Sequence, residues 1–156
     1  MEFSALKVTS FFRQDGDFIK IDEFKGPFLD TNYIEGALSV HLYGKELFDI
    51  SLWDYVDQLW AYLVDGICAV AAGESYSCYF PDQPIRIEFE VVGRNQVKIF
   101  VGVGAGRTGV VGKEEFVSIF GNAAMQFFLR MIALVPADSS TFNAYIGKLS
   151  KLVKSG

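Results

Sequence analysis

A glycine-rich segment is the first stretch of the sequence whose residue types could do chemistry. Its residues 104–109 follow the G-x-G-x-x-G spacing that cradles the pyrophosphate of a dinucleotide. In that motif the glycines lead directly into a helix, a strand follows, and an acidic residue lies about twenty positions further on. Here the predicted helix begins only near Lys113, no strand is predicted after it, and Leu129 stands at the acidic position. We therefore interpret Gly102 to Gly112 as a mobile loop, whose glycines and exposed Arg107 could also fit a partner.

The other reactive residue types are sparse. His41 is the only histidine, which excludes a site with two histidine ligands, and Cys68 and Cys78 lack the spacing of metal-binding cysteines. His41 also falls on the polar side of a predicted strand, and no G-x-S-x-G element presents a nucleophilic serine. We expect an exposed or hydrogen-bonded histidine, two free thiols, and no catalytic, cofactor-binding or metal-binding residue.

Carboxylates are plentiful, and their distribution along the chain is uneven. Residues 1–91 carry sixteen Asp and Glu against six Lys and Arg, a net charge of −10. Residues 92–156 carry three against eight, a net charge of +5. No two carboxylates stand out as a general acid–base pair. The overall charge of −5 argues against a nucleic-acid partner, whose phosphates require a basic surface.

A predicted helix carries part of the acidic excess of the first half. Three aspartates lie beside its apolar stripe, and two further acids and two tyrosines are close in sequence: Asp54, Asp57, Asp65, Glu74, Asp82, Tyr55 and Tyr62. Such an edge is either a solvated helix face or a docking surface for a basic protein. On a docking surface the charges raise the association rate and the tyrosines supply contact area. These seven residues are our candidates for partner binding.

The elements that must position these residues begin with hairpins. Apolar segments at 3–13 and 18–24 flank Asp15-Gly16, a dipeptide that favours a tight hairpin turn. Alternation of apolar and polar residues marks 38–42 as a half-buried strand, and a short strand is expected over 47–50. A helix then opens at Ser51, because Ser51 and Asp54 form a variant of the capping box, and it ends at Gly73.

Two alternating segments, 85–91 and 97–103, predict a hairpin together with its register, after a short strand at 76–80. A three-residue loop at 93–95 sets Val91 opposite Val97 and Glu90 opposite Lys98, so that one face of the hairpin is entirely apolar. A two-residue loop would pair Val91 with Lys98 and mix the faces. Burial of one face therefore selects an odd loop length, such as that of the three-residue loop.

Two further helices are predicted, one over 113–135, which Pro136 ends, and one that begins at Ser139 or Ser140. The fold class is therefore α+β: an antiparallel β-sheet built from hairpins with about three α-helices packed on one face, in a single domain over residues 1–156. The apolar stretch 123–136 is too short to span a bilayer and contains Arg130, so no membrane partner is expected. The first four residues lack the basic and apolar regions of a signal peptide, which predicts a cytoplasmic protein.

Two segments, FDISLWDYVDQLW at 48–60 and YFPDQP at 79–84, resemble those of bacterial immunity proteins. Such proteins are encoded beside polymorphic or contact-dependent toxins, and the resemblance covers roughly residues 45–130. It implies a small, acidic, cytoplasmic protein without catalytic residues that binds one cognate toxin domain and blocks it. Many of these toxins are basic nucleases, which the acidic first half of this chain would suit.

The leading hypothesis is therefore a non-enzymatic inhibitor that binds a cognate toxin domain through an acidic surface. The alternative is a small-molecule-binding domain or a homo-oligomeric structural module, because fifteen phenylalanines could line an apolar pocket between sheet and helices. An enzyme is a third reading, supported only by the glycine-rich segment and the spare carboxylates. No cofactor is predicted.

Overall fold

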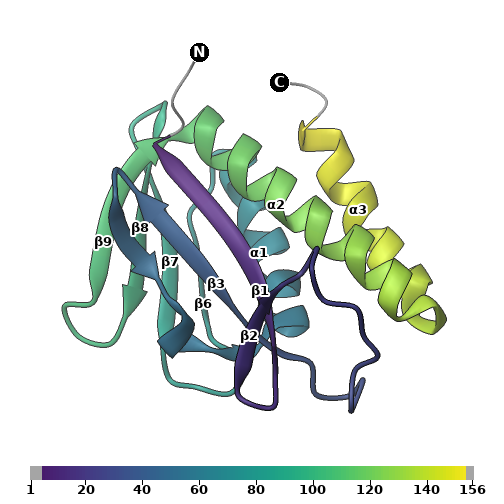
Figure 1. Ribbon diagram of the computed structural model, residues 1–156. Helices are drawn as coiled ribbons and strands as arrows, with labels where there is room; N and C mark the ends of the chain where they lie inside the picture. The colour runs from purple at the N-terminus through teal and green to yellow at the C-terminus, as the bar shows by residue number, and fades with distance from the viewer. Residues whose placement is uncertain (1–4, 154–156) are drawn as a thin grey trace.

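The computed structural model describes residues 5–153, and within that range nine β-strands and three α-helices alternate in groups (Figure 1). The strands are β1 (Leu6–Gln14), β2 (Asp17–Lys20), β3 (Glu35–Leu42), β4 (Lys45–Phe48), β5 (Asp54–Tyr55), β6 (Tyr76–Tyr79), β7 (Arg86–Val92), β8 (Gln96–Gly102) and β9 (Arg107–Gly112). The helices are α1 (Val56–Ala71), α2 (Lys113–Leu134) and α3 (Ser139–Val153).

The strands form two antiparallel sheets. One has the order β2-β1-β3-β4, with β5 paired to β3, and the other has the order β6-β7-β8-β9. Helices α1 and α2 contact strands of both sheets, whereas α3 packs on α2 and α1, on the side of α2 away from the strands (Figure 1). The predicted α+β fold is confirmed, and the division of its strands into two sheets is a feature that the sequence did not indicate.

Helix α1 lies at the centre of the hydrophobic core. The fully buried Trp60 donates its indole N–H to the hydroxyl of Ser10 in β1, with 3.0 Å between the two atoms. At Gly66 the helix approaches the second sheet so closely that an added Cβ would lie 2.7 Å from the ring of Tyr76 and 2.8 Å from that of Phe89. The buried stripe predicted for this helix therefore packs against both sheets.

The start of α1 differs from the sequence-based expectation. The helix begins at Val56, not at Ser51, and the predicted capping box is wrong. Ser51 lies in the 3₁₀ turn Ile50–Leu52, where its backbone N–H donates to the carboxylate of Asp49 at 2.8 Å. Asp54 lies in β5, outside the helix. The Ser51 hydroxyl donates to Asp49 and the Asp54 carboxylate accepts from Tyr55, Asp82 and Gln83, so both side chains of the expected box have other partners.

The other helix ends agree with the sequence. Gly73, with a φ of 84°, follows α1, and the backbone N–H groups of Gly73 and Glu74 donate to the carbonyls of Val70 and Ala69 at 2.9 and 2.8 Å. This pair of bonds is a Schellman motif, which requires the left-handed conformation that glycine adopts readily. Helix α2 begins at 113, as predicted, and ends at 134, one residue before the predicted end, and α3 begins at 139, one of the two predicted starts.

By length and composition alone, α2 could cross a membrane. The core helix of a soluble protein passes the same test, and α2 packs here against β1, α1 and α3. Phenylalanines supply most of this packing, and the buried residues of α2 are Phe116, Phe120, Gly121, Ala124, Phe127, Phe128 and Met131.

The register predicted for the β7–β8 hairpin is confirmed, with Val91 opposite Val97 and Glu90 opposite Lys98. The loop predicted over 102–112 is wrong in its second half, because 107–112 forms β9 and pairs with β8. Gly109 of β9 packs against the other sheet, where an added Cβ would lie 2.6 Å from Leu42. The glycine there permits close packing of the two sheets.

The hairpins of the first half are close to prediction. The β1–β2 turn uses Asp15 and Gly16 with φ values of 54° and 81°. Strand β2 stops at Lys20, four residues before the predicted end, and β3 begins three residues before its predicted start. The first two residues of the predicted strand 3–13 lie outside the described residues.

Candidate protein-binding site

The seven residues predicted to bind a partner do not share one surface. Asp54, Tyr55 and Asp82 lie at the N-terminal end of α1, whereas Glu74 is exposed beyond its C-terminal end. A helix of sixteen residues is about 24 Å long at a rise of 1.5 Å per residue, so the length of α1 separates these groups. The acidic helix edge expected from the sequence is therefore divided into separate local environments.

Asp54 provides little exposed charge. Its side chain is buried, and its carboxylate accepts the backbone N–H groups of Tyr55 and Asp82 at 2.7 and 3.1 Å and the side-chain amide of Gln83 at 3.1 Å. The Gln83 amide also donates to the backbone carbonyl of Trp53 at 2.6 Å. Asp54 thus ties β5 to the turn after β6, and its role is to shape this region.

Asp57, in the first turn of α1, is half-buried, and one of its carboxylate oxygens has no hydrogen-bond partner within the described part of the chain. Loss of contact with water raises the pKa of Asp57, and the negative charge of Asp138 adds to this rise. The backbone N–H groups of Gln58 and of Asp57 itself act in the opposite direction. This carboxylate faces its own protein and is poorly placed to meet a partner.

Tyr62 and Asp65 are exposed on the outer face of α1. The carboxylate of Asp65 lies 3.6 Å from the ammonium group of Lys148 in α3, and both side chains are more than half exposed. Such a pair contributes little to stability, but the cation offsets the charge of Asp65. This part of the predicted surface is therefore close to neutral.

The strongest candidate is a cavity of about 310 Å³ that opens beside the N-terminal end of α1. We call it the acidic notch. Three segments that are distant in sequence form its walls, and its lining residues are Glu35, Trp53, Asp54, Tyr55, Asp82 and Gln83. The notch thus contains three of the seven predicted residues, together with three that the sequence did not indicate.

One cation belongs to the acidic notch. The guanidinium of Arg13 in β1 donates to Glu35 at 2.8 Å and lies 4.0 Å from the ring centre of Trp53. The notch is lined by three carboxylates, those of Glu35, Asp54 and Asp82, and Arg13 pairs with Glu35 alone, so the formal charge of this group is −2. The notch therefore attracts cations.

Tyr55 stands among these charges. Its ring packs against that of Tyr33 with 5.5 Å between the ring centres. Partial loss of contact with water raises the pKa of the Tyr55 phenol, and the negative charges of Asp82, Glu35 and Asp54 raise it further. The hydroxyl group consequently stays protonated and can donate a hydrogen bond.

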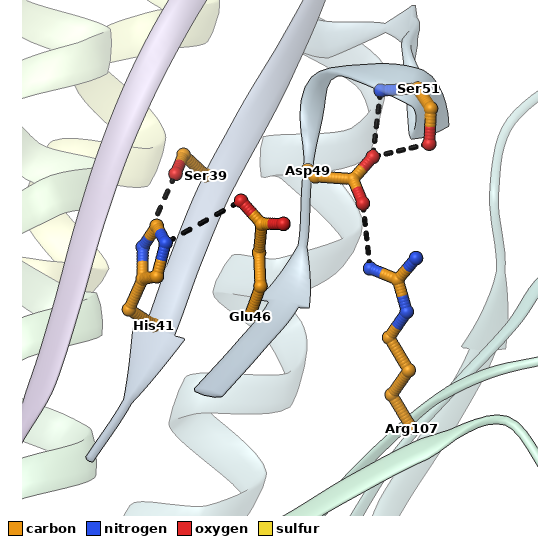
Figure 2. Close-up of polar contacts among 6 residues, drawn as sticks. All are labelled: Ser39, His41, Glu46, Asp49, Ser51 and Arg107. Carbon is orange, nitrogen blue, oxygen red and sulfur yellow. Dashed lines mark hydrogen bonds and ion pairs between the residues drawn. The ribbon is translucent and has the colours of Figure 1, made fainter. Parts of the chain in front are cut away.

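His41 is hydrogen-bonded on the outer side of its strand, as predicted. Its two ring nitrogens lie 3.4 Å from the hydroxyl of Ser39 and 3.4 Å from the carboxylate of Glu46 (Figure 2). The order serine, histidine, acid resembles that of hydrolytic triads. Both contacts are long, however, the His41 and Glu46 side chains are 40% and 50% exposed, and none of the three residues lines the acidic notch. The arrangement is that of a solvated polar cluster.

Asp49 and Arg107 join the two sheets next to this cluster (Figure 2). The guanidinium of Arg107 donates to Asp49 at 2.8 Å, and nearby the ammonium of Lys45 donates to the carbonyl of Thr108 at 2.7 Å. The hydrogen bond from the Ser51 hydroxyl is the largest cause that lowers the pKa of Asp49, and Arg107 lowers it further. Arg107 thus holds the glycine-rich segment against the end of β4.

A second cavity of about 480 Å³ lies between β1, the segment after β2, and α2. Its walls include the apolar side chains of Val8, Ile21 and Leu129, and Arg130 at its edge donates to the carbonyl oxygens of Ile21, at 2.8 Å, and Phe24. Within residues 5–153, no group of three or more His, Cys, Asp and Glu side chains is placed to hold a metal ion.

Comparisons of the chain with family models, with curated proteins and with solved structures gave no match. Of the residues that the sequence analysis missed, Trp53 and Gln83 are adjacent to predicted ones, whereas Glu35 and Arg13 carry no local signal. They join the site only because β1, β3 and β5 are neighbours in one sheet.

Proposed function

We propose that this protein is a non-enzymatic binding protein that docks a basic protein partner on its acidic notch. The observation that carries the proposal is the local charge of −2 beside exposed aromatic rings, in a cavity open to solvent. Of the partners that fit, a toxin domain neutralised by its cognate immunity protein is the one that the sequence resemblance favours.

Charged and aromatic groups have different effects at protein interfaces. Negative charge that is not neutralised speeds the approach of a basic partner, and like-charged proteins are rejected. Aromatic side chains supply the area that becomes buried at the centre of an interface. Trp53, which lines the notch, is 37% exposed, and Tyr33, which packs on Tyr55 beside it, is 58% exposed, so both rings have surface that a partner can cover.

The test is to express this protein with the toxin domain encoded beside its gene. Cells should survive with the protein and die without it, and the purified pair should associate faster at low ionic strength. Asp82→Asn should slow association at low salt. Glu90→Gln is the control: it also removes one negative charge, but from the second sheet, opposite Lys98, so it should leave the association rate unchanged. The proposal is contradicted if the protein does not protect the toxin-expressing cells, or if the Asp82→Asn and Glu90→Gln variants associate with the toxin domain at the same rate.

A small-molecule-binding function remains as the second candidate, and the cavity between β1 and α2 is the observation that favours it. Its size falls in the range of ligand sites, and its walls combine apolar side chains with charged ones. A metabolite that strongly raises the melting temperature of the protein would support this candidate. If the neighbouring genes encode only metabolic enzymes, it becomes the better proposal.

A further inference from the structure

We propose that the acidic notch is a pocket for one arginine side chain, presented by the partner. This inference rests on the proposed function and specifies its central contact. The notch offers three things that together suit a guanidinium: a cavity of about 310 Å³, flat aromatic walls, and a carboxylate that forms no ion pair with any residue of the described range 5–153.

The cavity has the size of a side-chain pocket. Its volume lies at the lower limit for drug-sized ligands, and one side of it is open to solvent. A side chain that projects from a protein surface can enter such a cavity, whereas a large cofactor would remain mostly exposed. Trp53 and Tyr55 supply two of its walls, and Tyr33 packs on Tyr55 beside it.

Asp82 is the carboxylate available to the incoming cation. It is exposed, and no ion pair joins its carboxylate to another residue in the described part of the chain. Asp54 is committed to three donors, and Glu35 is bound by Arg13 through one oxygen, which leaves the second oxygen of Glu35 for another contact. An entering guanidinium would therefore pair with Asp82 and share Glu35.

The protein's own Arg13 indicates why arginine fits better than lysine. Its guanidinium lies against the Trp53 ring and donates to Glu35 at the same time. A planar guanidinium can stack on a ring and present a fork of donors to a carboxylate, whereas an ammonium group is a strongly hydrated point charge. Arg13 stacks on Trp53 and donates to Glu35. In the same way, the entering arginine would stack on Tyr55 and donate to Asp82.

The experiment uses the indole N–H signals of the two tryptophans in a two-dimensional ¹⁵N–¹H spectrum. Trp53 lines the notch, and Trp60 is buried in the core and provides the internal control. The probes are the Nα-acetyl methylamides of arginine, lysine and citrulline, titrated at 150 mM salt. The arginine probe should shift the Trp53 signal in a saturable manner and leave the Trp60 signal in place. The uncharged citrulline probe should leave both unchanged.

The lysine probe should bind roughly two- to fivefold more weakly than the arginine probe, the effect of one exposed cation–π contact. Asp82→Asn should weaken the binding of the arginine probe, whereas Glu90→Gln should leave its affinity unchanged. Equal affinity of the lysine and arginine probes, or no shift of the Trp53 signal, overturns the arginine pocket. Neither result depends on a protein partner, so the proposed function is tested separately by the protection of toxin-expressing cells.

Discussion

Asp54→Asn is the substitution that most directly tests the account of the acidic notch. Every contact that the Asp54 carboxylate makes is with a donor: the backbone N–H of Tyr55, the backbone N–H of Asp82 and the side-chain amide of Gln83. An asparagine replaces one acceptor oxygen by an amide that is itself a donor. Whichever way that amide is turned, it meets at least one backbone N–H group that no longer has an acceptor.

The expected cost follows from these contacts. The side chain of Asp54 is only 3% exposed, so water cannot readily replace the lost acceptor. A backbone hydrogen bond to a charged acceptor contributes about 1.5–3 kcal/mol, and an orphaned buried donor costs a similar amount. We expect Asp54→Asn to lower the free energy of unfolding by about 2–3 kcal/mol. In a chain of this length that corresponds to a fall of roughly 4–12 °C in melting temperature.

Urea unfolding followed by circular dichroism measures this change, and Asp82→Asn is the matched control because Asp82 is exposed and uses its backbone, not its carboxylate, to contact Asp54. The control should change stability by less than about 0.5 kcal/mol. If Asp54→Asn is as stable as the control, then Asp54 does not organise the notch, and the reasoning from its three hydrogen bonds is refuted.

Three further predictions concern the core and the charged groups. Gly66→Ala should destabilise the protein by about 1–3 kcal/mol because the added Cβ would overlap two aromatic rings. Gly147→Ala is the control: its Cβ would have open space in α3, and it should stabilise the protein by up to about 1 kcal/mol. Thermal unfolding of the two variants measures both changes. Ser10→Ala should cost about 1–3 kcal/mol in urea unfolding by removing the acceptor of the Trp60 indole, and no loss would mean that this bond contributes nothing. Burial raises the pKa of Asp57 above its ordinary value of 3.8, so the folded state holds this proton more tightly than the unfolded chain and stability rises as the pH falls through the folded-state pKa towards 3.8. Asp57→Asn should therefore be more stable than the parent protein at pH 7 and lose that advantage on acidification; an advantage that persists at pH 4 contradicts the assignment.

Much of the fold is determined by local patterns in the sequence. The alternation of apolar residues favours Val91 opposite Val97, because a loop with an even number of residues would mix the apolar and polar faces of the hairpin. Glycine after α1 and proline after α2 end their helices through backbone chemistry that operates wherever the chain folds. These features depend on neighbours within a few residues, and the sequence contains those neighbours.

The predictions that were wrong share one physical cause: segments distant in sequence contact the residues on which the local pattern was based. Asp54 has the spacing of a helix cap, but the backbone of Asp82 and the amide of Gln83 bind it, so the helix starts later. Gly109 belongs to a pattern typical of loops, but the second sheet packs against Leu42 there and only a glycine leaves the space.

The sequence by itself determined an α+β chain with an acidic first half and placed Asp54, Tyr55 and Asp82 among the candidates. Only the tertiary structure decided that these residues meet Glu35, Trp53 and Arg13 and that Asp57 and Asp65 face elsewhere. The reason is that charge and residue type are properties of the chain, whereas a cavity is a property of segments brought together by strand pairing and burial.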